Sequence, residues 1–366
     1  EAARLAVAEA QEALNPMRRL LDLIVLKRAE FIDIEPMALA DPAVVDTRRS
    51  TEKVQGLLAK LQPIHFPVEF PEIFSGPNPG FNCILGNPPW EEIMVDEDTF
   101  WATKSPGLGS VDGQARLQFM SDLASDHPHW LAEYANRVTE MRILRECLTA
   151  GPYPDLNRGN ADLYKAFCWR FWSQVANQGV VGVVLPRSAL TARGSASWRK
   201  QILDSGDFIE VTVGQNRGGW LFADVGSMIT VALVSIQKTG RPDDVVAIRG
   251  PFSSFAAYEK GFRLPARTLS ANDLGSWSEG ASFPLIPSPQ AFNTFLRLRQ
   301  SDNLTDVFTV RPVQGDFNAT TGRKAGHFSV DMDAEPPGAL PVLGGASFNL
   351  WQPDTGKRKG WADPRV

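Results

Sequence analysis

The sequence FNCILGNPPW, at residues 81–90, is the stretch that decides the fold. Residues 81–85 are a short, mostly apolar run that predicts a buried β-strand, and Gly86 with the Asn-Pro-Pro that follows predicts a turn that ends it. In an open α/β sheet, ligands bind beyond the carboxyl ends of the strands. The turn Asn87–Trp90 therefore lies where a ligand site is expected.

The residue types of this turn suit a planar amino nitrogen as the substrate. The lone pair of an adenine amino group is delocalised into the ring, so this nitrogen is a poor nucleophile. The side-chain oxygen of Asn87 and the carbonyl of Pro88 are two acceptors for its N–H groups, and Pro88 and Pro89 stiffen the backbone that presents them. Trp90 offers an aromatic face for a base that has left the duplex. The alternative is an ordinary Asn-Pro turn with Trp90 in the core.

The residues that follow the turn alternate between helical and strand patterns. We expect helices at 162–176 and 196–204 and strands at 180–185, 208–213 and 228–236. This alternation predicts an α/β fold with a largely parallel, doubly wound sheet, whose last two strands could form an antiparallel hairpin at one edge. Residues 1–62 have the apolar spacing of helices, and 304–366 look like turns and short strands of a second domain.

Composition limits the class of protein only broadly. The chain has 366 residues, of which 43% are hydrophobic and 22% charged, as in ordinary soluble globular proteins. It lacks an apolar run of about 18 residues, the length that would predict a membrane span. Its formal net charge of -5 gives no sign of the basic face expected of a nucleic-acid-binding protein. The 3 cysteines have neither zinc nor disulfide spacing, which favours a reducing, cytoplasmic location.

Five segments resemble the motifs of the amino-group DNA methyltransferases, in the family's order. Phe81–Trp90 resembles motif IV, and motifs V to VIII are matched by Asn160–Phe167, Gly179–Pro186, Ser188–Lys200 and Gly219–Phe222. The resemblance covers residues 64–240. It is closest to the long adenine methyltransferases of type IIG restriction–modification systems and of phage-defence systems such as DISARM and BREX. It implies a Rossmann-like methyltransferase sheet, of which this chain would carry the part with motifs IV to VIII.

The resemblance implies methyl transfer to the N6 amino group of adenine in DNA. The Asn87–Trp90 turn would bind the flipped base, and Phe222 would stack on the opposite face of that base, with Trp220 as the nearby competitor. The amine would attack the sulfonium methyl directly, without a covalent enzyme intermediate and without a metal. We therefore interpret His127–His129 and Asp96–Asp98 as polar loop residues rather than ligands.

S-adenosylmethionine is the cofactor that the resemblance implies. Asp162, Leu163 and Phe167 would border its adenosine, although Phe167 fits the core face of its helix equally well. The glycine-rich motif I, which in the family wraps the methionine part of the cofactor, has no convincing counterpart in residues 1–80 or 240–366. We expect the chain to be a piece of a longer protein with motif I upstream, and to bind the cofactor poorly by itself.

These patterns predict four parts of the chain. They are a helical segment at 1–63, the catalytic methyltransferase part at 64–240, a connecting region at 241–300 and the start of a mixed α+β target-recognition domain at 301–366. In the last part, Lys357, Arg358 and Lys359 are candidate phosphate contacts, with a solvated basic loop as the alternative. The expected partners are double-stranded DNA and other subunits of a restriction–modification or phage-defence system, and no membrane.

Two other functions remain open at this point. The missing motif I suits a DNA-binding or scaffold subunit that keeps the base pocket without transferring methyl groups. Methylation of glutamine in a protein would use a similar Asn-Pro-Pro pocket for a planar amide nitrogen. The aromatic Trp90, the long insertion after it and the C-terminal extension favour a nucleobase.

Overall fold

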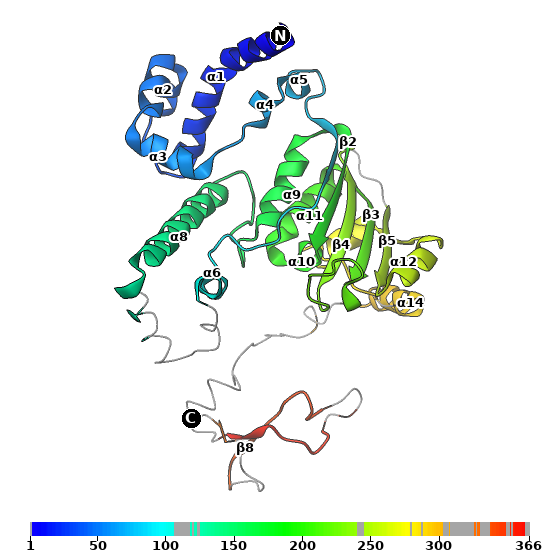
Figure 1. Ribbon diagram of the computed structural model, residues 1–366. Helices are drawn as coiled ribbons and strands as arrows, with labels where there is room; N and C mark the ends of the chain where they lie inside the picture. Colours follow the sequence, from blue (N-terminus) through cyan, green and yellow to red (C-terminus); the bar gives the residue numbers. More distant parts are fainter. Residues whose placement is uncertain are drawn as a thin grey trace. The chain divides into compact units, whose positions relative to one another are not determined.

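The chain forms two compact units, Glu1–Phe295 and Leu296–Val366, each of which is described by itself. The computed structural model (Figure 1) describes residues 2–105, 118, 121–122, 125–239, 245–278, 280–286, 288–302, 307, 326, 328–329, 337–348, 352 and 354–362. No helix within these ranges is both long and apolar enough to cross a bilayer.

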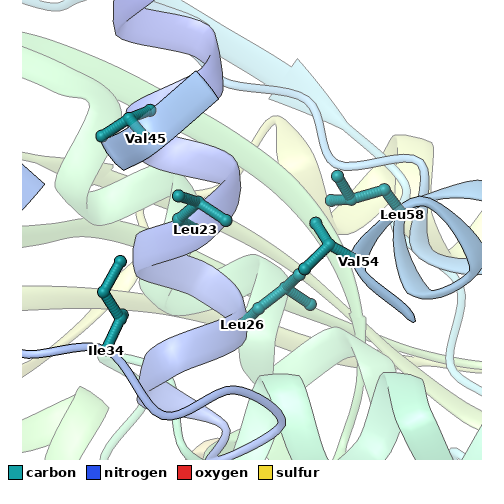
Figure 2. Packing of buried hydrophobic residues seen from close by; sticks show 6 residues of the cluster. All are labelled: Leu23, Leu26, Ile34, Val45, Val54 and Leu58. Carbon is teal, nitrogen blue, oxygen red and sulfur yellow. The ribbon is translucent and has the colours of Figure 1, made fainter. Parts of the chain in front are cut away.

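Helices form the part of the first unit that precedes the sheet, and the spacing of residues 1–62 predicts those that lie before α4. They are α1 (Ala2–Arg28), η1 (Pro36–Ala40), α2 (Pro42–Arg49), α3 (Glu52–Leu61), α4 (Phe66–Glu69) and α5 (Pro71–Phe74). The apolar faces of α1, α2 and α3 pack with Ile34 into one cluster (Figure 2), whose buried members are Leu23, Leu26, Ile34, Val45, Val54 and Leu58. Burial of such aliphatic side chains contributes about 1.5–3 kcal/mol each, so this cluster holds the helices together.

A buried carboxylate ties these helices to the segment that leads into the sheet. Asp22 on α1 is 3% exposed. Its Oδ2 accepts a hydrogen bond from Arg49 Nε at 2.8 Å, and its Oδ1 lies 2.9 Å from Nε2 of His65. Because His65 directly precedes α4, this contact fixes the start of the chain segment that enters β1.

A six-stranded mixed sheet forms the core of the first unit, in the order β1-β2-β4-β3-β5-β6. The strands are β1 (Phe81–Gly86), β2 (Val175–Pro186), β3 (Asp207–Gln215), β4 (Thr230–Gln237), β5 (Val245–Phe252) and β6 (Arg267–Ser270). The pairs β1–β2 and β3–β5 are parallel, and β4 and β6 run antiparallel to their neighbours. The carboxyl ends of β1, β2, β3 and β5 therefore lie at one edge of the sheet.

Strand β4 is antiparallel to β3, as the sequence predicts, but the prediction that this hairpin lies at an edge is wrong. β4 lies between β2 and β3, and its Ala232 pairs with Leu185 on one side and Val213 on the other. Four of the eight residues of β4 are buried, namely Val231, Ala232, Val234 and Ile236. An apolar strand buried in this way suits the interior of a sheet. Strands β5 and β6 come from the segment for which the sequence predicts only a connecting region.

Helices cover the sheet and form the long insertion after β1. Around the sheet are α9 (Leu163–Gln174), α10 (Ser188–Thr191), η3 (Arg193–Ser195), α11 (Ala196–Ser205), α12 (Phe255–Phe262), α13 (Ala271–Trp277) and α14 (Pro289–Leu298). The insertion contains α6 (Glu97–Lys104) and α8 (Pro128–Thr149). Figure 1 shows α9, α10 and α11 together against one side of the sheet. The helices predicted at 162–176 and 196–204 are confirmed as α9 and α11.

A buried arginine joins α11 to two neighbouring segments. Arg199 is 0% exposed and donates hydrogen bonds to the carbonyls of Ala189 at 2.8 Å, Ala192 at 3.0 Å, Gly280 at 2.6 Å and Ala281 at 3.0 Å. Burial lowers the pKa of its guanidinium to about 10. The carbonyl oxygens thus replace water around this buried charge.

The described part of the second unit holds a small antiparallel sheet. Its strands are β7 (Phe328–Ser329), β8 (Leu340–Val342) and β9 (Gly360–Ala362), in the order β7-β9-β8. The short strands expected in 304–366 are therefore confirmed. Gln314–Asn318 and Thr321–Lys324, for which the sequence predicts turns, lie outside the described residues.

Candidate functional site

The turn after β1 presents two free acceptors. Asn87 is exposed, Pro88 is buried, Pro89 is exposed and Trp90 is half-buried. Neither the side chain of Asn87 nor the carbonyl of Pro88 has a hydrogen-bond partner among the residues that the structure describes. The side chain of Asn87 is therefore accessible to a ligand at the carboxyl edge of the sheet, and the neighbouring Pro88 carbonyl is an acceptor without a partner among the described residues.

Backbone pairing ties the residues after the turn to the start of α9. The N–H of Leu163 donates to the carbonyl of Glu91, and the N–H of Ile93 donates to the carbonyl of Ala161, both at 2.9 Å. Glu92 and Asp162 form the antiparallel bridge between these two bonds. Asp162 and Leu163, for which the resemblance implies a place in the cofactor site, thus lie beside the residues that directly follow the Asn87–Trp90 turn.

Trp90 and Phe222 meet although Trp90 follows β1 and Phe222 lies in the loop between β3 and β4. Their ring centroids are 6.3 Å apart and their planes make an angle of 87°. The indole Nε1 of Trp90 lies 3.4 Å from the carbonyl of Val184 on β2, a long hydrogen bond. A base held between two parallel rings needs a ring separation of about 7 Å, twice the contact distance of carbon atoms. The ring of Phe222 must therefore rotate before one of its faces can stack on a base.

The loop that carries Phe222 is organised by one buried side chain, Asn216, directly after β3. Asn216 is 0% exposed. Its Oδ1 accepts from the N–H groups of Leu221 and Phe222 at 3.0 Å each, and its Nδ2 donates to the carbonyls of Phe222 and Val225 at 2.9 Å each. Sequence reasoning did not single out this residue. The available signal was an asparagine between a strand and a Gly-Gly turn, a position at which its side chain often bonds to nearby backbone.

Trp220 lies in a different environment from Phe222. Its Nε1 donates to the carbonyl of Gln215 at 2.7 Å, and its ring centroid is 6.3 Å from that of Tyr258. With Phe252 and Phe255 it lines a mainly apolar cavity of about 280 Å³. Of the two aromatic residues considered for the stacking face, Phe222 is the one with a ring contact to Trp90.

The residues predicted to border the cofactor form a small surface next to the turn. Asp162, Leu163 and Phe167 are each half-buried. The Oδ2 of Asp162 lies 3.2 Å from Nζ of Lys165, and the ring of Phe167 is 5.7 Å from that of Phe171. An acceptor oxygen beside two partly exposed apolar side chains suits one wall of an adenosine site, so these residues fit that part of S-adenosylmethionine.

The polar clusters of the insertion have local structural partners. The ring of His127 stacks on Trp130, with centroids 4.0 Å apart and an interplanar angle of 23°. Asp96 caps α6, and its Oδ1 accepts from the N–H of Thr99 at 3.0 Å. This bond lowers the pKa of Asp96. Within the described ranges, no three His, Cys, Asp or Glu side chains gather in a way that could hold a metal ion.

The basic triplet of the second unit is partly neutralised. Both terminal nitrogens of Arg358 donate to the carboxylate of Asp354, each at 2.7 Å. These bonds are the main reason that the pKa of Asp354 is lowered to about 2. Lys357 and Lys359 are exposed, so they are the members of the triplet best placed to contact an anion.

Three further arginines lie near the carboxyl edge of the sheet, and sequence reasoning missed them. Arg187 follows β2 directly, and its N–H donates to the carbonyl of Thr230 at 3.0 Å. Arg193 lies in η3, and Arg217 is next to Asn216. None of the three side chains forms an ion pair within the described residues. For Arg187 and Arg217, positions just after strands β2 and β3 were the signal for a site at this edge.

Comparison with known proteins finds similarity only among solved structures. Neither a family model nor a curated protein matches the chain. The modification subunit of a putative type I restriction enzyme from Vibrio vulnificus YJ016 is 16% identical, with a TM-score of 0.31 over 55% of this chain and 36% of that chain. The methyltransferase subunit of the type I restriction–modification system from Streptococcus thermophilus is 14% identical, with a TM-score of 0.28 over 56% and 38%.

The type IIG restriction endonuclease BpuSI is also similar, at 14% identity and a TM-score of 0.31, over 57% of this chain and 27% of that chain. The chain thus spans less than half the length of each of these proteins. Scores this low do not establish a shared fold, so the assignment of function rests on the residues of the site.

Proposed function

We propose that this chain carries the catalytic part of an S-adenosylmethionine-dependent methyltransferase that modifies the N6 amino group of adenine in DNA, in a restriction–modification or phage-defence system. One observation carries the proposal. The Asn87–Trp90 turn offers two unpaired acceptor oxygens at the carboxyl end of β1, and Trp90 beside them is in ring contact with Phe222.

The two acceptors activate the amino group by their geometry. Asn87 Oδ1 and the Pro88 carbonyl accept its two N–H groups, which favours a pyramidal nitrogen whose lone pair points away from them. The prolines restrict the backbone, so little reorganisation is needed when charge develops on the nitrogen. S-adenosylmethionine, when bound, supplies an electrophilic methyl group on a sulfonium. The amino nitrogen would take this methyl group and release a proton to solvent, with the neutral thioether as the leaving group.

The aromatic rings hold the base and keep its edge against the acceptors. Trp90 and, after rotation, Phe222 stack on the two faces of the adenine. Stacking of a base on an aromatic side chain contributes about 1–3 kcal/mol, which offsets part of the cost of removing the base from the duplex. Arg187, Arg193 and Arg217 contact the phosphates next to the flipped nucleotide, because they lie at the same edge of the sheet and their charges are unpaired within the described residues.

The test compares transfer of a labelled methyl group to unmethylated duplex DNA by the full-length protein and two variants. Asn87→Ala removes one acceptor. Asn82→Ala is the matched control, because Asn82 is also an exposed asparagine of the same segment, within β1. We expect N6-methyladenine in DNA, identified by mass spectrometry of nucleosides, with wild type and Asn82→Ala and a loss of about a hundredfold or more with Asn87→Ala.

Two outcomes would overturn the proposal. Retention of DNA without any transfer by the wild-type protein indicates a binding or scaffold subunit. Label in a protein fraction instead of DNA indicates glutamine methylation.

A further inference from the structure

We propose that Asn216 is a positioning residue that sets the place of Phe222 over the target base. The inference rests on the proposed function, because it assigns a role within the same base pocket. Its basis is a single buried amide whose hydrogen-bonding capacity is completely used on the loop between β3 and β4.

The side chain of Asn216 is saturated. A carboxamide has two donor hydrogens and an oxygen with two lone pairs, and all four are used by backbone groups of Leu221, Phe222 and Val225. The residue is 0% exposed, so water cannot replace a lost partner. A buried donor or acceptor left without a partner is costly, and the loop therefore keeps this one arrangement.

Both backbone groups of Phe222 are bound to the same amide. Its N–H donates to Oδ1 of Asn216 at 3.0 Å, and its carbonyl accepts from Nδ2 at 2.9 Å. The backbone of Phe222 is thus fixed, and the ring can move only by rotation about its side-chain torsions. Such rotations pass between staggered states without backbone change. The edge-to-face contact with Trp90 is therefore a resting position from which the ring turns onto a base.

Asn216 is in turn fixed to the centre of the sheet. Its N–H donates to the carbonyl of Ile229 at 2.9 Å, and its carbonyl accepts from the N–H of Gly219 at 3.1 Å. The pair Gln215 and Thr230 closes the ladder between β3 and β4 just before it. The position of Phe222 is therefore determined by the sheet, through one amide, although the residue lies in a loop.

This position requires asparagine because the two N–H donors of its side chain bind carbonyls of the loop. Aspartate has the same shape and can accept from Leu221 and Phe222, but its carboxylate cannot donate and would face the carbonyls of Phe222 and Val225. Leucine fills a similar volume and makes none of the bonds. Asn216→Asp and Asn216→Leu therefore form a graded pair. The loop keeps two of its four hydrogen bonds to the side chain of residue 216 in Asn216→Asp and loses all four in Asn216→Leu.

The first readout is amide hydrogen exchange of residues 217–229 in this chain, without DNA or cofactor. We expect faster exchange in Asn216→Leu than in Asn216→Asp, with the rest of the sheet unchanged. Unchanged protection of the Leu221 and Phe222 amides in Asn216→Leu would overturn the inference. This result does not depend on methyl transfer, so it separates a failure of the inference from a failure of the proposed function.

The second readout is a double-mutant cycle in the full-length enzyme. Asn216→Asp is expected to lower kcat/KM for DNA by about ten- to a hundredfold, since two hydrogen bonds are lost. Asn216→Asp should also lower the rise in fluorescence that 2-aminopurine at the target position shows when the base leaves the duplex. In a Phe222→Ala background the same change should cost less than about twofold, because Asn216 acts through the Phe222 ring. Equal losses in both backgrounds would show a merely structural role and overturn the inference.

Discussion

The indole of Trp90 and the phenyl ring of Phe222 meet edge to face, with centroids 6.3 Å apart and planes at 87°. One ring follows β1 and the other lies in the loop between β3 and β4, so the contact exists only in the folded sheet. In this arrangement the two rings fill the space between them with their own atoms. A base that enters must replace a ring–ring contact, worth about 0.5–1.5 kcal/mol, with two stacking contacts.

Replacement of Phe222 by alanine is expected to lower kcat/KM for DNA methylation by about ten- to a hundredfold, since one stacking face is lost. The fluorescence of 2-aminopurine at the target position measures base stacking independently of transfer. Trp220→Phe is the matched control, because Trp220 packs near Tyr258 in a separate cavity. An equal loss with Trp220→Phe would mean that the Trp90–Phe222 contact is not part of the base pocket.

Arg217→Gln is expected to weaken binding to all DNA sequences alike, because phosphate contacts carry no sequence information. The slope of log affinity against log salt should fall by about one, the value for one lost phosphate contact. Titrations of duplex DNA at several salt concentrations measure this slope. Arg142→Gln serves as the control, since Arg142 is already paired with Glu146 at 2.7 Å on α8. A change of sequence preference in Arg217→Gln would contradict the phosphate assignment.

Loss of the buried guanidinium of Arg199 is expected to destabilise the first unit by about 3 kcal/mol or more, because four carbonyls in two segments lose their donor. Urea denaturation of Arg199→Met measures the free energy of unfolding. Lys200→Met is the control, because Lys200 is the next residue and is exposed. If the two variants were equally stable, these hydrogen bonds would have no net effect on folding.

The pair of Asp354 and Arg358 gives a pH prediction for the second unit. The pKa of Asp354 is lowered from 3.8 to about 2, mainly by its hydrogen bond from Arg358. A carboxyl with a lower pKa in the folded state stabilises that state above the unfolded pKa, and this contribution is lost as the pH falls from 3.8 to 2. Carboxyl titration by NMR should place the midpoint near 2 in wild type and at a higher pH in Arg358→Gln, in which only the hydrogen bond from the N–H of Gly356 still lowers the pKa of Asp354. A wild-type midpoint near 3.8 would show that the pair is absent in solution.

The sequence predicts those parts of the fold whose apolar residues recur with a clear helical or strand spacing. Helix α9 and strands β2, β3 and β4 are confirmed. The strand before the Asn-Pro-Pro turn is present as β1, but its predicted burial is wrong, because none of its residues is buried and Leu85 is 85% exposed. The neighbours of β4 could not be predicted, because an alternating apolar pattern assigns the faces of a strand but not its partners. The strand at Val245–Phe252 lies in a segment whose pattern is weak.

For the candidate site, residue types could be predicted better than contacts. Asn87 and Trp90 were chosen for their chemistry, whereas the choice between Phe222 and Trp220 depends on a ring contact that sequence cannot give. Asn216 was missed because an asparagine in a loop usually indicates an ordinary turn. The pairing of Arg358 with Asp354 could have been predicted, since Asp354 precedes Arg358 by four residues in the sequence.

The pairing of Gln215 with Thr230 at the base of the Phe222 loop has a consequence for divergence among related enzymes. Paired strands lie about 5 Å apart, so the two ends of the loop remain together whatever its length. Doubling the length of such a loop costs only about 0.6 kcal/mol. Insertions between Val225 and Ile229, beyond the last bond to Asn216, can therefore reshape the rim of the pocket while the sheet stays intact, and new preferences for flanking nucleotides can arise there at little thermodynamic cost.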